Sequence, residues 1–148
     1  MFIGTAGGAI YWDGNSASEL GEGNSWNLQP SQFFDFAIDG GDLYAGTNIG
    51  VCKYSVSSLG INDCVNAQDG MPNWGVSAVG VNGSTIFGGT NNGVGLIDKS
   101  SLSVYDTWEA GDETDNALVE VIDDIAYIGL NGIGVARYDI PNNNWLPT

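Results

Sequence analysis

The stretch Ile86-Phe87-Gly88-Gly89-Thr90-Asn91-Asn92-Gly93 decides how this chain folds, because its centre recurs through the whole sequence. The recurrences are Phe2-Ile3-Gly4-Thr5, Tyr44-Ala45-Gly46-Thr47 and Tyr127-Ile128-Gly129-Leu130. Successive copies lie about 42 residues apart, and a near-constant interval of this length indicates one supersecondary unit repeated along the chain.

Each copy is surrounded by what a small antiparallel sheet requires. An Asn/Gly turn and a short apolar strand follow it, then a more polar strand, and in three units a further apolar strand and tight turn precede it. The predicted innermost strands are 34–38, 76–81 and 117–122, and the second strands are 2–5, 44–47, 87–90 and 127–130. The predicted third strands are 9–13, 51–55, 94–98 and 135–139, and the outermost strands are 25–28, 61–65, 104–108 and 144–146.

Four short strands in a unit of about 42 residues are the content of a β-propeller blade. We therefore expect an all-β fold, a β-propeller of four-stranded antiparallel blades. About four blades are countable, with three strands in the first and four in each of the others. The 148 residues make a single propeller domain or propeller segment, with repeat units 1–32, 33–75, 76–116 and 117–148.

The repeated residues predict how neighbouring sheets meet. The aromatic side chain before each Gly-Thr is expected to fill the wedge against the adjacent sheet, and four tryptophans at recurrent positions are expected to pack. These tryptophans are Trp12, Trp26, Trp108 and Trp145. Small residues in the second strands let the sheets approach closely, and the glycines of the Asn/Gly turns supply positive φ angles.

One unit carries a longer pattern. It runs from Asp69-Gly70-Met71-Pro72-Asn73 through Val76-Ser77-Ala78-Val79 to the Gly-Gly-Thr stretch and Leu96-Ile97-Asp98. This resembles the repeat of the two-component regulator propeller family, while the other units keep only the Gly-Thr, glycine-turn and strand-end portions. The resemblance implies a propeller fold and a role as a glycan-recognising periplasmic input segment of a sensor.

Composition excludes several function classes. The chain has 18 acidic and 3 basic residues, a net charge of −15, so binding to nucleic acid or to an anionic membrane surface is not expected. It has no histidine, which excludes Ser-His-Asp and Cys-His catalysis and His-ligated metals. No apolar run is long enough for a membrane span. Few lysines among many Asn, Ser, Thr and Gly favour an extracellular or periplasmic location.

Trp74 is the tryptophan that falls outside the recurrent positions. Together with Asn73 it lies between an outer strand and the next inner strand, near the predicted mouth of the central channel. An exposed aromatic ring beside polar loops suits a carbohydrate or a peptide, and the alternative is a loop anchored by an apolar ring.

Acidic residues offer two further candidate sites. Asp112, Glu113, Asp115 and Asn116 crowd one loop and could supply oxygen ligands to calcium, although without the spacing of an EF-hand; the alternative is a solvated acidic loop. Asp35 and Glu120 lie on predicted inner strands, where two carboxylates could perform glycoside chemistry or simply be solvated. No other cofactor is expected.

Cys52 and Cys64 fall on the third and outer strands of one unit. Centring the hairpin between them makes the two residues directly opposite, so a disulfide is expected, with two free thiols as the alternative. Asn82-Gly83-Ser84 matches a glycosylation sequon, but it lies in a tight hairpin.

These features favour a non-enzymatic extracellular module that binds ligands through its loop faces, or that assembles with copies of itself into a ring or a filament. The first unit lacks an inner strand, and an open arc of sheets would expose aromatic wedge faces at both ends, which is the reason for expecting self-association. A glycan-sensing segment of a two-component sensor is the alternative, and a carboxylate-based glycoside-active enzyme is the third possibility.

Overall fold

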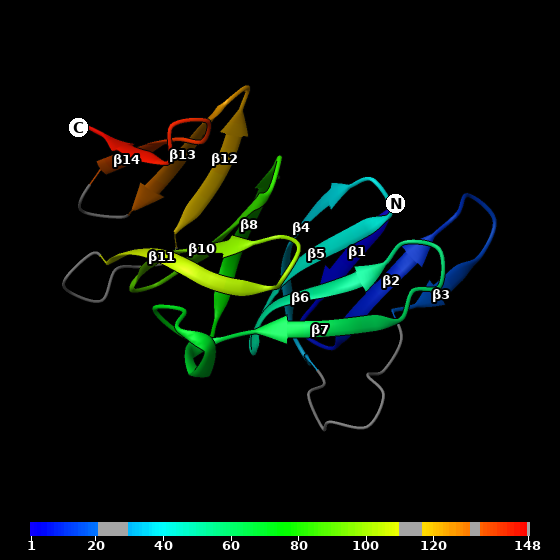
Figure 1. Ribbon diagram of the computed structural model, residues 1–148. Helices are drawn as coiled ribbons and strands as arrows, with labels where there is room; N and C mark the ends of the chain where they lie inside the picture. Colours follow the sequence, from blue (N-terminus) through cyan, green and yellow to red (C-terminus); the bar gives the residue numbers. More distant parts are fainter. Residues whose placement is uncertain (21–29, 110–116, 131–133, 148) are drawn as a thin grey trace.

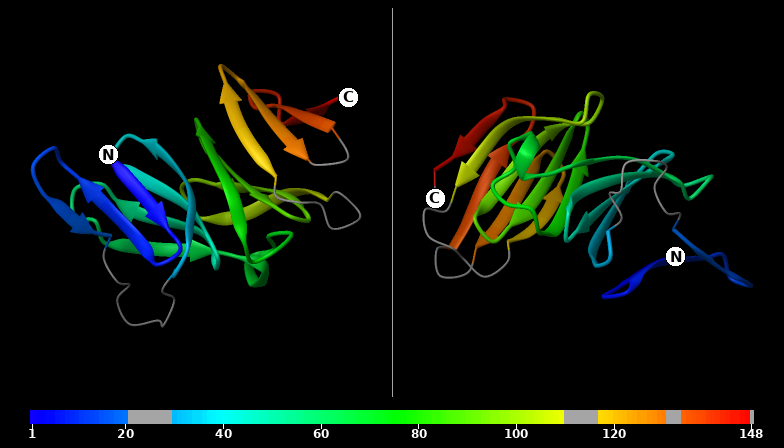
Figure 2. Two further views of the ribbon diagram at one scale, coloured as in Figure 1. Left: turned by 180° about the vertical axis from the view of Figure 1, so that it is seen from behind. Right: turned by 90° about the horizontal axis from the view of Figure 1, so that it is seen from below.

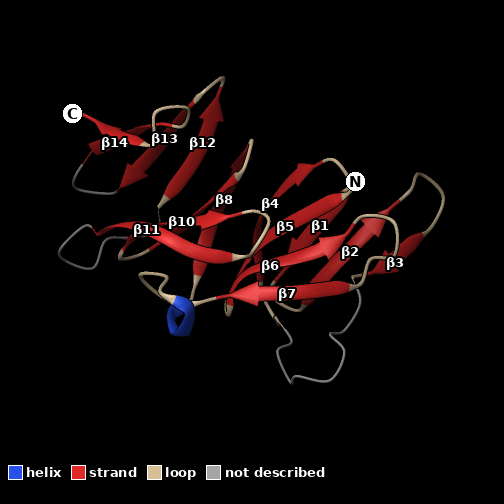
Figure 3. Cartoon of the chain, viewed as in Figure 1, coloured by secondary structure: helices blue, strands red, loops and turns tan. Residues whose placement is uncertain are grey.

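The computed structural model describes residues 1–20, 30–109, 117–130 and 134–147. Their strands form four consecutive antiparallel sheets (Figures 1 and 3). The first sheet contains β1 (Phe2–Thr5), β2 (Gly8–Trp12) and β3 (Ala17–Glu19). The second contains β4 (Phe33–Asp39), β5 (Asp42–Thr47), β6 (Gly50–Ser55) and β7 (Ile61–Val65), and is followed by one turn of 3-10 helix, η1 (Ala67–Asp69).

The third sheet contains β8 (Val76–Asn82), β9 (Thr85–Thr90), β10 (Gly93–Asp98) and β11 (Ser103–Glu109). The fourth contains β12 (Leu118–Ile122), β13 (Ile125–Leu130), β14 (Gly134–Asp139) and β15 (Asn144–Leu146). In each sheet the strands follow one another in chain order. The predicted all-β architecture, with three strands in the first sheet and four in each of the others, is confirmed.

The third strand of the first sheet differs from the prediction. The strand that pairs with β2 is β3, Ala17–Glu19, whereas the sequence pattern predicts it at 25–28, which lies outside the described residues. The reason is local. The carboxylate of Asp13 accepts hydrogen bonds from the N–H groups of Asn15 (2.7 Å) and Ser16 (2.8 Å), and this turn reverses the chain earlier than expected.

The sheets stand side by side in a row. Inner strand β8 lies between β4 and β12, and β1 lies next to β4 because the first sheet, as far as it is described, has no inner strand of its own. Figures 1 and 2 show the first sheet (blue) and the last sheet (orange to red) at opposite ends of this row, with the two termini far apart. The described chain is thus an arc of sheets.

The Gly-Thr motif stabilises the turn between the second and third strands. The Thr47 hydroxyl donates to the carbonyl of Gly50 at 2.8 Å and accepts from the N–H of Ile49 at 3.2 Å. Thr5 and Thr90 make the same pair of hydrogen bonds in their own turns. Gly50 has a φ of 129°, a conformation that a residue with a side chain rarely adopts, so glycine is required there.

The core consists of three apolar clusters, one at each junction between neighbouring sheets. Side chains at the three junctions are, in chain order, Phe33, Leu43, Cys52 and Tyr54; Tyr44, Val51, Val76 and Ile97; and Phe87, Val94, Ile128 and Tyr138. Two of the aromatics before Gly-Thr behave as predicted, since Tyr44 and Phe87 are fully buried against the following sheet. Phe2 is half-buried, with its ring centroid 6.0 Å from that of Phe36.

Candidate functional site

The face of the fourth sheet that is turned away from the third sheet is apolar and has no described sheet against it. We call it the forward face and define it by Leu118, Ile122, Tyr127 and Val135, all of which are exposed. Tyr127 occupies the same register position in the fourth sheet as Phe87 in the third, and it is 36% exposed where Phe87 is 0% exposed. Val135 is 54% exposed, whereas the equivalent Val94 is 0% exposed.

The prediction that every aromatic before the repeated motif is a core residue is therefore wrong for Tyr127. The reason is that burial at this position is provided by the following sheet. Gly129 shows the same effect. A Cβ atom at Gly46 or Gly89 would lie within 3.0 Å of the next sheet, while at Gly129 the nearest atom would be 3.7 Å away and belongs to its own sheet.

The face of the first sheet that is turned away from the second sheet forms the opposite end of the row. We call it the backward face and define it by Met1, Ile3, Ile10 and Trp12. Cross-strand pairing puts Ile3 opposite Ile10, and backbone hydrogen bonds join Met1 to Trp12, so the four side chains share one face. Trp12 is 38% exposed, so the expectation that it packs in the core is wrong; the equivalent Tyr54 and Tyr138 are buried at junctions.

The recurrent tryptophans of the other units pack between sheets. The rings of Trp108 and Trp145 lie 6.0 Å apart, across the junction of the third and fourth sheets. Trp26 lies outside the described residues.

Both end faces also carry charges. Glu120 and Arg137 lie on the forward face because each is directly opposite Tyr127 in the register of the fourth sheet. Glu19 lies on the backward face, opposite Ile10. The Arg137 guanidinium donates to the carbonyl of Pro147 at 2.6 Å, which ties this cation to the backbone that follows β15.

A small pocket of about 240 Å³ lies where the second and third sheets meet at their loop ends. We call it the loop-face pocket; it is lined by Phe34, Asn73, Gly75, Ser77 and Asn91. The Asn73 side-chain amide donates to Asn91 Oδ1 at 2.6 Å, and Asn73 Oδ1 accepts from the N–H of Trp74 at 2.6 Å. Trp74 is exposed and follows Asn73 directly, although it does not line the pocket.

Phe34, Ser77 and Asn91 were not singled out from the sequence. Phe34 could have been found, because two adjacent aromatics at 33 and 34 cannot both point into one face of a regular strand. In the structure Phe33 is buried and Phe34 is exposed, and the register of β4 with β5 shifts between Phe33 and Asp35.

The two candidate catalytic carboxylates are not brought together. Asp35 Oδ2 accepts from the N–H of Val79 at 2.8 Å and its Oδ1 accepts from the N–H of Phe36 at 2.8 Å, so this carboxylate ties β4 to β8. Glu120 lies on the far side of β8, on the exposed face of β12. Asp35 therefore has a structural role, and Asp35 and Glu120 do not form the carboxylate pair that glycoside chemistry would require.

The candidate calcium loop, with Asp112, Glu113, Asp115 and Asn116, lies outside the described residues. Within the residues that are described, no group of three or more Cys, Asp or Glu side chains could hold a metal ion.

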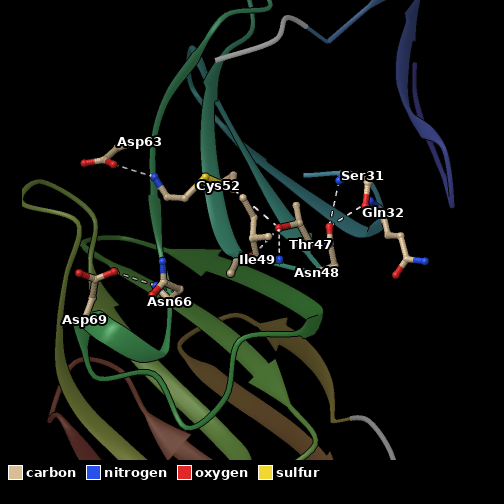
Figure 4. Close-up of a disulfide and its surroundings, with 11 residues drawn as sticks. Ser31, Gln32, Thr47, Asn48, Ile49, Cys52, Asp63, Asn66 and Asp69 are labelled. Carbon is tan, nitrogen blue, oxygen red and sulfur yellow. Dashed lines mark hydrogen bonds between the residues drawn. A yellow bond between two sulfur atoms is a disulfide. The ribbon is translucent and has the colours of Figure 1, made fainter. Parts of the chain in front are cut away.

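Cys52 and Cys64 form a disulfide between β6 and β7 in the structure (Figure 4). Their Cα atoms lie 4.1 Å apart, as in a directly opposed cross-strand pair, and both side chains are buried at the junction of the first and second sheets. Below the bridge, the Asn66 side chain accepts from the N–H of Gln68 at 2.8 Å and caps η1.

The sequon residue Asn82 is already engaged, since its side-chain amide donates to the carbonyl of Asp123 in the adjacent hairpin of the fourth sheet. Within the described residues, no helix has the length and apolar character needed to cross a membrane.

Solved structures resemble the chain in fold. A computationally designed protein, Ika4, superposes with a TM-score of 0.71 at 13% identity, over 94% of this chain and 84% of that one. The extracellular domain of a putative one-component system of B. thetaiotaomicron gives 0.68 at 19% identity, over 99% of this chain and 20% of that domain. The WD40 repeats of RRP9 give 0.64 at 13% identity, over 82% and 39%.

WD40 repeats form β-propellers, so these likenesses show a propeller fold. At such identities they show the fold alone, and this chain spans a fifth of the length of the bacterial extracellular domain. The sequence matches no protein-family model and no curated protein.

Proposed function

We propose that this chain is a non-enzymatic propeller module, working outside the cytoplasm, that assembles through its two end faces. The observation that supports the proposal is the exposure of Tyr127, Val135 and Trp12. In the sheets with a neighbour on that side, the equivalent positions are buried, except that Phe2, the equivalent of Tyr127 in the first sheet, is half-buried. Apolar side chains gathered on one face of a soluble protein mark an interaction surface.

The energetics favour covering these faces. Burying one Val, Leu, Ile or Phe side chain stabilises a complex by about 1.5–3 kcal/mol relative to leaving it in water. Each end face carries four large apolar side chains, so covering even a part of both faces offsets some of the entropy lost on association.

A location outside the cytoplasm is supported by the disulfide, since disulfides persist in oxidising compartments. The proposal of a non-enzymatic role is supported by Asp35, whose carboxylate is occupied by two backbone N–H groups. It is supported further by the absence of histidine from the sequence.

The test is the mass of the 148-residue chain in solution, measured by light scattering across a range of micromolar concentrations. We expect species larger than the 15.5 kDa protomer, growing with concentration. A folded protein that stays at 15.5 kDa throughout would contradict the proposal.

A second candidate function is recognition of a saccharide at the loop-face pocket, which would agree with the sensor role implied by the sequence resemblance. The observation that favours it is the combination of the exposed Phe34 ring with the side-chain amides of Asn73 and Asn91 in one pocket. Aromatic rings stack on the apolar faces of sugars while amides bond their hydroxyl groups.

This candidate is tested by calorimetric titration with a panel of soluble oligosaccharides. Phe34→Ala should weaken binding by about tenfold or more, whereas Tyr105→Ala, at an exposed aromatic outside the pocket, should not. Failure of every oligosaccharide to bind, or equal binding by both variants, would exclude it.

A further inference from the structure

We infer that the assembly joint is head-to-tail: the forward face of one copy docks on the backward face of a second copy. The two faces meet at the same equivalent positions as neighbouring sheets do inside the chain, so that Tyr127 of one copy lies against Trp12 of the second copy. This inference rests on the proposed function and specifies its geometry.

Every internal junction joins two different kinds of face. The forward-facing side chains come from one set of register positions, represented by Tyr44 and Val51 in the second sheet. The backward-facing side chains come from the alternate positions, represented by Leu43, Cys52 and Tyr54. The fourth sheet has an uncovered forward face and the first sheet an uncovered backward face, so two copies offer one complementary pair.

The internal junction of the third and fourth sheets indicates which side chains meet. There the Phe87 ring lies edge-on to the Tyr138 ring, with centroids 5.8 Å apart. Tyr127 is the register equivalent of Phe87. Trp12 on β2 is the equivalent of Tyr138 on β14, since each directly precedes an aspartate that accepts hydrogen bonds in the turn after its strand. The same edge-on aromatic contact can therefore form between copies.

Charge agrees with this pairing. Arg137 stands beside Tyr127 on the forward face, and Glu19 stands beside Ile10 on the backward face. A head-to-tail joint brings one of the three basic residues of the chain toward an acidic residue of the second copy. Opposite charges across an interface favour one orientation and suppress others.

The joint does not extend over the whole forward face. Among the described residues the first sheet has no inner strand, so β12 of one copy has nothing equivalent to β8 or β12 to pack against in the second. Leu118, which is 72% exposed on β12, therefore stays outside the joint, while Val135 on β14 is covered. This difference distinguishes a specific joint from unspecific apolar sticking and provides a matched control.

A head-to-tail contact leaves one face of each kind free at the two ends of any open assembly. It therefore closes into a ring when the rotation per copy permits, and otherwise propagates as a filament. A face-to-face contact between two forward faces would instead stop at a dimer.

The experiment uses three variants of the 148-residue chain: Val135→Arg on the forward face, Trp12→Arg on the backward face and Leu118→Arg as the control. Circular dichroism is the check that each variant is folded, which we expect because the substitutions are at exposed positions. We expect Val135→Arg alone and Trp12→Arg alone to be monomeric by native mass measurement, and Leu118→Arg to assemble like the unmodified chain.

The decisive sample is an equal mixture of Val135→Arg and Trp12→Arg. Each of these variants keeps one intact face of the opposite kind, so the mixture should form dimers containing one copy of each variant and nothing larger. If Val135→Arg or Trp12→Arg dimerises by itself, or if their mixture stays monomeric while the unmodified chain assembles, the head-to-tail joint is wrong although assembly stands. If the unmodified chain is itself monomeric, the proposed function fails as well.

Discussion

The glycine of the repeated motif, which precedes a threonine or, in the fourth copy, Leu130, changes its role along the chain. A Cβ atom at Gly46 would lie 2.7 Å from the backbone oxygen of Val76, which no side-chain rotation can relieve. At Gly129 the same atom would lie 3.7 Å from its nearest neighbour, an ordinary contact distance. Glycine is therefore required where a following sheet is present and is tolerant of change where it is not.

We predict that Gly46→Ala lowers the free energy of unfolding by about 1–3 kcal/mol, because the backbones of two sheets must separate. Gly129→Ala should change it by less than about 0.5 kcal/mol. Urea unfolding of the two variants, followed by circular dichroism, measures the difference. Equal effects at the two positions would show that the close approach of β5 to the third sheet does not limit stability.

At the scale of elements, the sheets are held together by junctions, and each junction contains one fully buried tyrosine. Tyr54 lies between the first and second sheets, Tyr44 between the second and third, and Tyr138 between the third and fourth. Burial, with the nearby carboxylates of Asp42 and Asp39, raises the pKa of Tyr44 to about 12. Burial also raises the pKa of Tyr54 and of Tyr138.

These shifts predict alkaline unfolding. The phenol of Tyr44 is kept neutral in the folded chain, so its contribution to stability is complete below the ordinary pKa of about 10. That contribution is lost as the pH rises through about 12. We expect tyrosinate absorbance from the buried rings to appear together with the loss of β-structure.

The control for this prediction is the triple variant Tyr44→Phe, Tyr54→Phe and Tyr138→Phe. It removes the ionisable groups while keeping the rings, so its unfolding transition should move to higher pH. An unchanged transition would mean that other groups govern the alkaline limit.

At the scale of the whole molecule, charge opposes the association that the end faces favour. Two copies with a net charge of −15 each repel one another at long range. At 0.1 M salt this repulsion is largely screened at distances beyond about 10 Å. The stabilisation from burying apolar surface does not depend on this screening.

We therefore predict that association strengthens as sodium chloride is raised from low concentration, measured by light scattering at fixed protein concentration. The Leu118→Arg variant should follow the same trend as the unmodified chain. Association that weakens with salt would show that charge pairs such as Arg137 with Glu19, and not the apolar faces, dominate the joint.

The strands were predictable because their determinants are local. Three determinants act within a few residues of one another along the chain. They are a threonine whose hydroxyl hydrogen-bonds across its own turn, a glycine with positive φ, and an aspartate whose carboxylate accepts from a backbone N–H of the turn that follows it. The exception was the third strand of the first sheet, where the Asp13 turn shortened the hairpin. The loop-face pocket was found only in part, since its Phe34 and Asn91 come from different sheets.

The sequence by itself determined the repeat, the hairpins and the alternation of side chains within each sheet, because these depend on residues close together along the chain. Only the tertiary structure decided which of the equivalent faces are buried. Tyr44 and Tyr127 stand in the same motif, yet one is fully buried and the other exposed. The physical reason is that burial at this position is supplied by the next sheet, which lies a whole repeat away and packs against some copies and not others.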